Sequence, residues 1–219
     1  MDVSVDADVV EGVRTVVHSH GRLDAVVACA GWGLSGPAED TPIADAKDQF
    51  ETNFWGAVRL VQAALPVMRS QGGGRLVLVG SLGGLIALPF QAFYSASKFA
   101  MEGYAEALAY EVAPFGIQVT VVEPGNIKTE FTANRRQVES PDGNPYRDAS
   151  FKAISVMERD ESNGAPAELV ARVVQKVLEA KRPPRRVSVG KAGERVGVVA
   201  KRLLPHRVFE AAAKGALGV

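Results

Sequence analysis

Ser81, Tyr94 and Lys98 are three side chains whose types and spacing could move a proton. If the segment after Tyr94 is helical, Tyr94 and Lys98 stand at positions i and i+4 on one helix face. A lysine ammonium about 4 Å from the phenol oxygen would favour the phenolate by roughly 4 kcal/mol at an effective dielectric near 20. Since one pKa unit corresponds to about 1.4 kcal/mol, the pKa of Tyr94 would fall from about 10 to about 7. Such a tyrosine could act as a general acid and base at neutral pH, with the Ser81 hydroxyl holding a substrate oxygen.

Several segments around these residues resemble the short-chain dehydrogenase/reductase family. They are Leu76–Ser81, Tyr94–Lys98, Thr52–Gly56 around Asn53, and Val121–Thr129, and their order and spacing fit the family throughout. The resemblance runs from Asp2 to about Phe131 and continues loosely to the C-terminus. It implies a Rossmann-type doubly wound parallel sheet with flanking helices. It also implies hydride transfer between NAD or NADP and an alcohol or carbonyl carbon.

The resemblance assigns a role to each of four catalytic residues. Ser81 would hold the substrate oxygen and Tyr94 would be the acid and base. Lys98 would lower the pKa of Tyr94 and bind the hydroxyls of the nicotinamide ribose. Asn53 would hold a water that connects Lys98 with bulk solvent, although a solvated helix face is the alternative for Asn53.

The same resemblance implies a set of cofactor contacts along the chain. They are Asp2 and Val3 near the adenine, Ala30 and Gly31 after a strand, Tyr94 and Lys98, Pro124 and Gly125 at a nicotinamide-side turn, and Ile127 and Thr129 near the carboxamide. Cys29 stands where the family has an asparagine before Ala30-Gly31, which weakens a structural hydrogen bond more than the chemistry. The choice between NAD and NADP stays open.

A Gly-rich turn that receives the dinucleotide pyrophosphate at a helix N-terminus is part of the family pattern. We find no such turn in this sequence, since Gly72–Gly74 fits a loop and Gly80–Gly84 belongs to the Ser81 motif. We therefore expect a single domain, residues 1–219, that lacks the first βαβ portion. Two alternatives to an enzyme stay open: a non-catalytic fragment or interaction subunit, and a protein bound peripherally to membranes.

Short apolar runs alternate with longer helical stretches along the chain, which predicts a parallel sheet built from βα units. We expect helices over 9–20, 45–69 (kinked near Pro66), 93–115 and 165–180, strands over 25–30, 75–80, 118–123 and 186–189, a mobile loop region over 128–164, and a helical tail from Lys191 interrupted by Pro205.

Composition narrows the possible partners. Acidic and basic residues balance at 25 each, so no overall field favours nucleic acid. Cys29 is the single cysteine, which excludes an internal disulfide. It lies in an apolar run, which favours a buried, inert thiol. With three histidines and one cysteine, no metal-ligand cluster is visible. We expect a cytoplasmic homo-oligomer whose partner is a small molecule, a lipophilic alcohol or carbonyl such as a steroid or retinoid.

The C-terminal tail concentrates positive charge. From Lys181 onward there are ten Lys and Arg residues against two acids, and apolar residues interleave with them. An amphipathic helix of this kind can bury one face. We expect it to form part of the wall over the substrate site or a subunit contact. Binding to a membrane surface is possible but not favoured.

Overall fold

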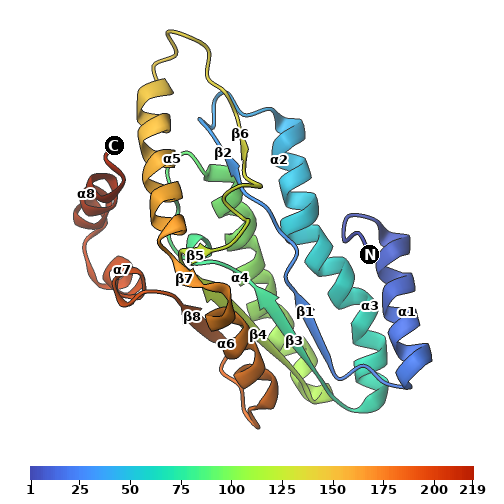
Figure 1. Cartoon of the computed structure of the whole chain (residues 1–219). Helices are drawn as coiled ribbons and strands as arrows, with labels where there is room; N and C mark the ends of the chain where they lie inside the picture. Colours follow the sequence, from blue (N-terminus) through green and yellow to red (C-terminus); the bar gives the residue numbers. More distant parts are fainter.

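A parallel sheet with helices on both faces forms the centre of the molecule (Figure 1). The computed structural model describes residues 1–219. The strands β1 (Ala25–Ala28), β3 (Gly74–Val79), β4 (Ile117–Pro124) and β8 (Arg186–Val189) pair in parallel in the order β1-β3-β4-β8. The expected Rossmann-type α/β fold is confirmed.

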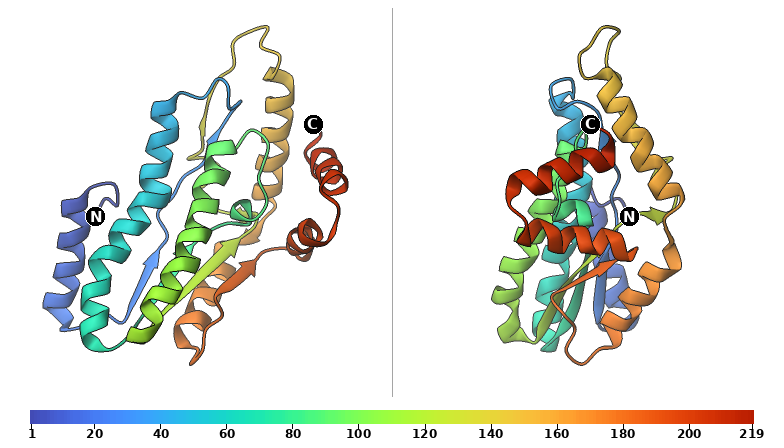
Figure 2. Two further views of the ribbon diagram at one scale, coloured as in Figure 1. Left: turned by 180° about the vertical axis from the view of Figure 1, so that it is seen from behind. Right: turned by 90° about the vertical axis from the view of Figure 1, so that its left-hand side faces the viewer.

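Alternation along β3 supplies both faces of the sheet with apolar side chains. Leu76 and Leu78 join a core with helices α1 (Asp6–His20), α3 (Gly56–Gln71) and α4 (Ala92–Val112). Val77 points to the other face, where it packs with Val177 of α6 (Ala167–Glu179). Figure 2 shows α6 across the sheet from α3 and α4. The sheet is therefore covered on both sides, as its continuous apolar strands require.

The helical region predicted over 45–69 contains a π-helical segment that the sequence did not reveal. Helix α2 (Ile43–Phe50) runs through the π-helical turn Glu51–Trp55 into α3, which contains Pro66 and ends at Gly72. Gly72 adopts a left-handed conformation with φ of 78°, which glycine tolerates. π-Helical turns are frequent at functional sites, and this one contains Asn53.

The region 128–164, predicted as a mobile loop, is partly helical. Helix α5 (Arg147–Ser162) buries Ala153, Ile154 and Met157, and its other positions are largely polar. That sparse apolar stripe is the reason why composition alone indicated a loop. Short parallel pairs form between β2 (Leu34–Ser35) and β6 (Arg136–Gln137), and between β5 (Ile127–Lys128) and β7 (Ala165–Pro166).

The tail forms two helices, α7 (Ala192–Leu203) and α8 (His206–Leu217), separated at Pro205 as predicted. None of the helices has both the length and the apolar character that crossing a membrane demands. At the opposite side of the sheet, β1 pairs only with β3, and its Val27 is exposed. Strand β1 is thus an edge strand.

Candidate active site

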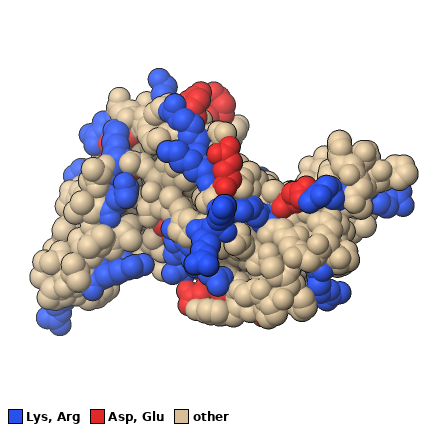
Figure 3. All heavy atoms as spheres, turned by 90° about the horizontal axis from the view of Figure 1, so that it is seen from below, with Lys and Arg blue, Asp and Glu red and all other residues tan.

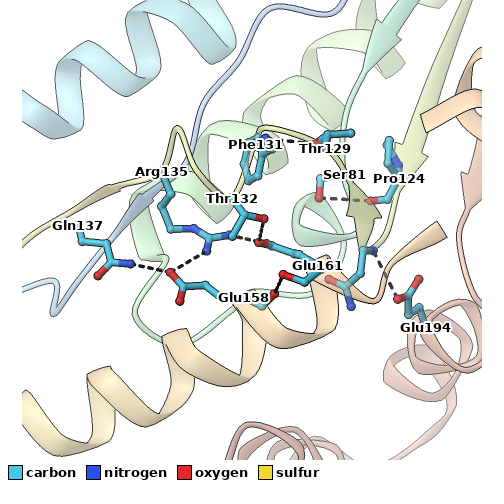
Figure 4. Close-up of polar contacts among 12 residues, drawn as sticks. Ser81, Pro124, Thr129, Phe131, Thr132, Arg135, Gln137, Glu158, Glu161 and Glu194 are labelled. Carbon is cyan, nitrogen blue, oxygen red and sulfur yellow. Dashed lines mark hydrogen bonds and ion pairs between the residues drawn. The ribbon is translucent and has the colours of Figure 1, made fainter. Parts of the chain in front are cut away.

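The loops that follow β1, β3 and β4 meet at the carboxyl edge of the sheet, where open α/β folds bind ligands. Ser81 follows β3, and its Oγ donates a hydrogen bond of 3.4 Å to the carbonyl of Pro124 at the end of β4 (Figure 4). The same Oγ accepts a bond of 3.0 Å from the Gly83 amide, which caps the short 3₁₀ turn Leu82–Gly84. Two backbone contacts therefore fix the position of the Ser81 hydroxyl.

Gly83 lies between Ser81 and Tyr94. A Cβ atom at Gly83 would lie 3.3 Å from Ser81 Oγ and 3.1 Å from Tyr94 Cε1. Both distances are tighter than an ordinary van der Waals contact, so the absence of a side chain lets the two catalytic candidates approach each other. The structure thus brings Ser81 and Tyr94 together across this glycine.

Lys98 stands one turn after Tyr94 on α4, as the i, i+4 spacing predicts. Its Nζ lies 5.9 Å from the centroid of the Tyr94 ring and donates a bond of 2.9 Å to the carbonyl of Val79. The side chain is buried, and burial lowers the pKa of Lys98 to about 8. The ammonium therefore loses its proton much more easily than an exposed lysine.

The pKa of Tyr94 differs from the expectation of a value near 7. Burial raises the pKa of Tyr94 above its usual value, and its hydrogen bonding with Ser81 opposes this only in part. The ring of Phe131 covers the tyrosine, with 5.7 Å between the two ring centroids. The Lys98 ammonium donates its hydrogen bond to the Val79 carbonyl rather than to the phenol oxygen of Tyr94. In this arrangement Tyr94 is a protonated acid at neutral pH.

Asn53 lies inside the site rather than on a solvated face, because its side chain is completely buried. Its Oδ1 accepts a bond of 2.9 Å from the Trp32 amide, while its Nδ2 donates to the Trp32 carbonyl at 3.0 Å and to Ser97 Oγ at 3.3 Å. A Cβ atom at Gly31 would lie 3.2 Å from Asn53 Oδ1 and 3.6 Å from Lys98 Nζ. Gly31 therefore lies between Asn53 and Lys98, as Gly83 lies between Ser81 and Tyr94. The four catalytic candidates thus share one site.

The predicted cofactor contacts divide into two groups. Ala30 and Gly31 are exposed at the end of β1, Pro124 and Gly125 end β4, and Ile127 and Thr129 follow on β5 and the next loop. Thr129 Oγ1 accepts a bond of 3.2 Å from the Phe131 amide. Of these residues, Gly31 lies beside Lys98 and Pro124 accepts the hydrogen bond of Ser81.

Asp2 and Val3 lie elsewhere, at the start of α1. Asp2 accepts hydrogen bonds from the amide and hydroxyl of Ser4, at 2.9 and 2.7 Å, and Val3 packs against Gly56 at the start of α3. No hydrogen bond joins either residue to Tyr94 or Lys98. Cys29, expected to be buried, is exposed, because it lies just beyond the edge strand β1 where no element covers it.

Sequence patterns missed a network beside Tyr94. The Arg135 side chain is fully buried, lies 5.8 Å from the Phe131 ring centroid and pairs with Glu161 of α5. Thr132 Oγ1 donates a bond of 2.6 Å to the same carboxylate (Figure 4). This network holds Phe131 over Tyr94. No local pattern marks it, since its partners are 26 to 29 positions apart.

Helix α7 packs against the loops beside the site. Glu194 accepts a bond of 3.0 Å from the Lys191 amide at the start of α7 and one of 3.4 Å from the Asn126 amide. A Cβ atom at Gly125 would collide with the Glu194 carboxylate. Lys201 Nζ donates to the carbonyl of Leu85, just after the Ser81 loop. These contacts fix α7 to the turn after β4 and to the loop after β3.

The site fits the nicotinamide half of a dinucleotide. Lys98 Nζ has one protein acceptor, so two of its protons can bind ribose hydroxyls. The Gly31 backbone is exposed beside Lys98. Residues 1–219 contain no Gly-rich turn at a helix N-terminus that would receive the pyrophosphate half.

Known proteins with similar sequences are named as reductases and dehydrogenases. The family model described as short chain dehydrogenase matches residues 1–140. The chain is 36% identical over 211 residues to 3-ketodihydrosphingosine reductase of Bacteroides thetaiotaomicron, covering 96% of this chain and 78% of that protein. It is 37% identical over 193 residues to retinol dehydrogenase 8 of Bos taurus, covering 85% of this chain and 61% of that protein.

Solved structures agree with these sequence matches. A short-chain dehydrogenase from Streptomyces avermitilis superposes with a TM-score of 0.82 at 30% identity, covering 98% of this chain and 78% of the other. The protein ElxO, solved with NADP bound, gives a TM-score of 0.58 at 34% identity, covering 59% of this chain and 53% of ElxO.

Proposed function

Because the chain belongs to the short-chain dehydrogenase/reductase family, we propose that it is an NAD(P)-dependent oxidoreductase that interconverts an alcohol and a ketone or aldehyde. The observation that carries this proposal is the convergence of Ser81, Tyr94 and Lys98 around Gly83 and Gly31. A titratable phenol, a fixed neutral hydroxyl and a buried ammonium at the carboxyl edge of the sheet are the groups that a carbonyl reduction needs.

Each of the three residues has a defined role in this proposal. When a substrate binds, the Ser81 hydroxyl turns its one proton from the Pro124 carbonyl to the substrate oxygen. Tyr94 gives that oxygen a proton in reduction or takes one in oxidation. Lys98 binds the ribose hydroxyls and stabilises the tyrosinate that remains after the proton has left. The nicotinamide ring, when bound, supplies or accepts the hydride.

The substrate that we propose is lipophilic. Phe131 packs on Tyr94, and Leu88 lies close to Gly83 beside the same ring. Apolar side chains next to the proton donor favour an apolar substrate body. The names of two relatives, a 3-ketodihydrosphingosine reductase and a retinol dehydrogenase, support the same class.

The decisive experiment is a NADH and NADPH oxidation assay at millimolar cofactor concentration. The substrate panel contains 3-ketodihydrosphingosine, retinal, a steroid ketone and a short water-soluble ketone. We expect turnover with at least one lipophilic carbonyl and much less with the short ketone. Turnover of the short ketone alone would refute the lipophilic class, and no turnover of any carbonyl by a folded protein would refute the enzymatic assignment.

A non-catalytic interaction subunit is the second candidate function. It is favoured by the exposed edge of β1, because an uncharged edge strand invites pairing with another chain. This candidate predicts a stable complex and no NAD(P)H turnover. The same oxidation assay therefore separates the two functions.

A further inference from the structure

Helices α7 and α8 lie outside the layers of the sheet and its covering helices (Figures 1 and 2). None of the α8 residues is buried, and Val198 is the buried residue of α7. A pair of helices with this little burial in the fold has a large surface left for another contact. The side chains on that surface indicate which kind of partner it contacts.

The two faces of α7 differ in their roles. Gly197, Val198 and Lys201 face the body of the protein, where Gly197 lies near Ile86 and Lys201 reaches Leu85. This is the face that forms the wall of the active site.

The opposite face of α7 is apolar and exposed. Val196, Val199 and Leu203 stand at positions i, i+3 and i+7, which places them on one stripe. Their exposed fractions are 63%, 53% and 77%. On α8, Val208 is 53% exposed as well. Such a continuous run of exposed apolar side chains marks an interaction site.

Arginines border this apolar stripe. Arg195 and Arg202, seven residues apart on α7, lie along one flank, and Arg207 stands next to Val208 on α8. All three are exposed, and no ion pair in the structure involves them. Figure 3 shows Lys and Arg side chains interspersed with uncharged surface on the side of the molecule where these helices lie. We call these seven residues the outer face: Val196, Val199, Leu203, Val208, Arg195, Arg202 and Arg207.

We propose that the outer face docks the protein on an anionic lipid bilayer. Apolar side chains flanked by arginines suit the boundary between acyl chains and anionic headgroups, where an amphipathic helix lies in the membrane plane. A second copy of the chain suits the outer face less well. Pairing two such faces would bring unpaired arginines together, and the nearby acid Glu210 is already paired with Lys214 at 2.9 Å.

Docking through this face would place the active site next to the membrane. The inner face of α7 contacts the loop after Ser81, so the helix that binds lipid also borders the substrate site. A lipophilic substrate could then pass from the bilayer without crossing much water. This consequence rests on the proposed function, whereas the docking itself does not.

Co-sedimentation of the full chain with vesicles tests the docking directly. One set of vesicles is phosphatidylcholine with about a third phosphatidylglycerol, and the other is phosphatidylcholine alone, both at physiological salt. We expect binding to the anionic vesicles that is at least tenfold stronger than binding to the neutral ones. Removing two charges by Arg195→Gln with Arg202→Gln should weaken anionic binding by roughly 30-fold.

Further variants separate the outer face from general charge. Val199→Gln with Leu203→Gln should weaken binding to both kinds of vesicle, and these exposed changes leave the fold intact by circular dichroism. The matched control, Arg172→Gln with Lys176→Gln on the exposed side of α6, should bind like the wild type. The proposal is overturned if the wild type does not sediment with anionic vesicles, or if the α6 control weakens binding as much as the arginine variant. A dimer in solution that Leu203→Gln disrupts would also overturn it, since a second copy would then cover the face.

Discussion

Tyr94 and Lys98 are both buried, and burial moves their pKa values in opposite directions. The pKa of Tyr94 is raised, and that of Lys98 is lowered to about 8. Desolvation disfavours the charged form of each group, which explains both shifts. At neutral pH the tyrosine is protonated and the lysine is still mostly charged. This protonation state suits Tyr94 as a proton donor, so we expect reduction to be the better-supported direction near pH 7.

Activity should therefore depend on the protonation of Lys98. As pH rises through about 8, the ammonium loses its proton and with it the stabilisation of the tyrosinate. We predict that kcat/KM for carbonyl reduction falls above that pH. Lys98→Met should lose both turnover and affinity for the nicotinamide cofactor, because one ammonium serves both. A pH–rate profile and cofactor titration of wild type and variant check this, and a Lys98→Met enzyme with unchanged cofactor affinity would refute the ribose contact.

Tyr94 and Lys98 could be placed from sequence because one helix turn brings residues i and i+4 together. Ser81 could be placed because its motif resembles that of the short-chain dehydrogenase/reductase family. The pKa of Tyr94 could not, since it depends on Phe131, which covers the ring from a distant loop. Cys29 shows the same limit. An apolar run predicts burial only if another element covers it, and the edge position of β1 leaves the thiol exposed.

At the level of elements, α4 connects the catalytic pair to the far edge of the sheet. Glu102, one turn after Lys98, accepts a bond of 2.9 Å from Arg186 Nε of β8. Arg186 also approaches Glu123 of β4 at 3.8 Å, and Ser188 Oγ donates to Glu123 at 2.6 Å. Two buried carboxylates thus share one arginine behind the active site. Burial, together with Glu123, raises the pKa of Glu102 to about 7.

The raised pKa of Glu102 should make the unfolding free energy depend on pH. Between its usual value of 4.5 and about 7, the folded protein holds a proton at Glu102 that the unfolded chain has lost. Stability due to Glu102 is therefore full below that window and declines as pH rises through it. We predict that the unfolding free energy of the wild type minus that of Glu102→Gln decreases from pH 5 to pH 8.

Urea unfolding at four pH values measures this difference. Glu106→Gln is the matched control for loss of one carboxylate, because Glu106 pairs with the same Arg186 at 2.8 Å from an exposed position. A difference between wild type and Glu102→Gln that grows with pH would contradict the raised pKa.

Elements with strong apolar patterns were predictable, and those with weak patterns were not. The strands β3 and β4 are runs of β-branched and aliphatic residues, and the sequence placed both to within a few residues. Helix α5 was predicted as a loop, since only a few of its positions are apolar. Its burial comes from tertiary contact, and its Glu161 anchors the loop that covers Tyr94.

At the level of the whole molecule, the unpaired edge of the sheet at β1 determines how residues 1–219 associate. Strand β1 has one partner, and Val27 on it is 39% exposed. The nicotinamide half of a dinucleotide has residues to hold it, whereas these residues offer no helix N-terminus with a Gly-rich turn for the pyrophosphate. Most of the charge of the cofactor would then lack its usual partner.

We predict that the purified polypeptide of residues 1–219 binds NADH and NADPH weakly and associates through the edge of β1. Isothermal titration with each cofactor and light scattering of the same sample measure both effects. Val27→Lys should suppress association, because a charge on an edge strand opposes pairing. A monomeric polypeptide that bound either cofactor with micromolar affinity would contradict this prediction.

The parallel sheet of βα units followed from the alternation of apolar runs and helical stretches, which is a property of the whole sequence. Its doubly wound arrangement followed from the family resemblance. The orientation of the tail did not follow. The same amphipathic pattern allows α7 to turn either its apolar stripe or its Gly197–Val198 side toward the body, and only the three-dimensional contacts with Leu85 and Ile86 decide between them.

The central claim is that Tyr94 gives the proton in an NAD(P)H-dependent carbonyl reduction. Its most direct test is the turnover number of Tyr94→Phe beside that of the wild type, at saturating cofactor and with the best substrate of the panel. Phenylalanine packs like tyrosine and removes only the titrating hydroxyl. We predict a loss of kcat of at least about a hundredfold, in the range that general acid catalysis contributes, with nearly unchanged cofactor affinity. Retention of more than about a tenth of the wild-type kcat would contradict the assignment of Tyr94 as the acid and base.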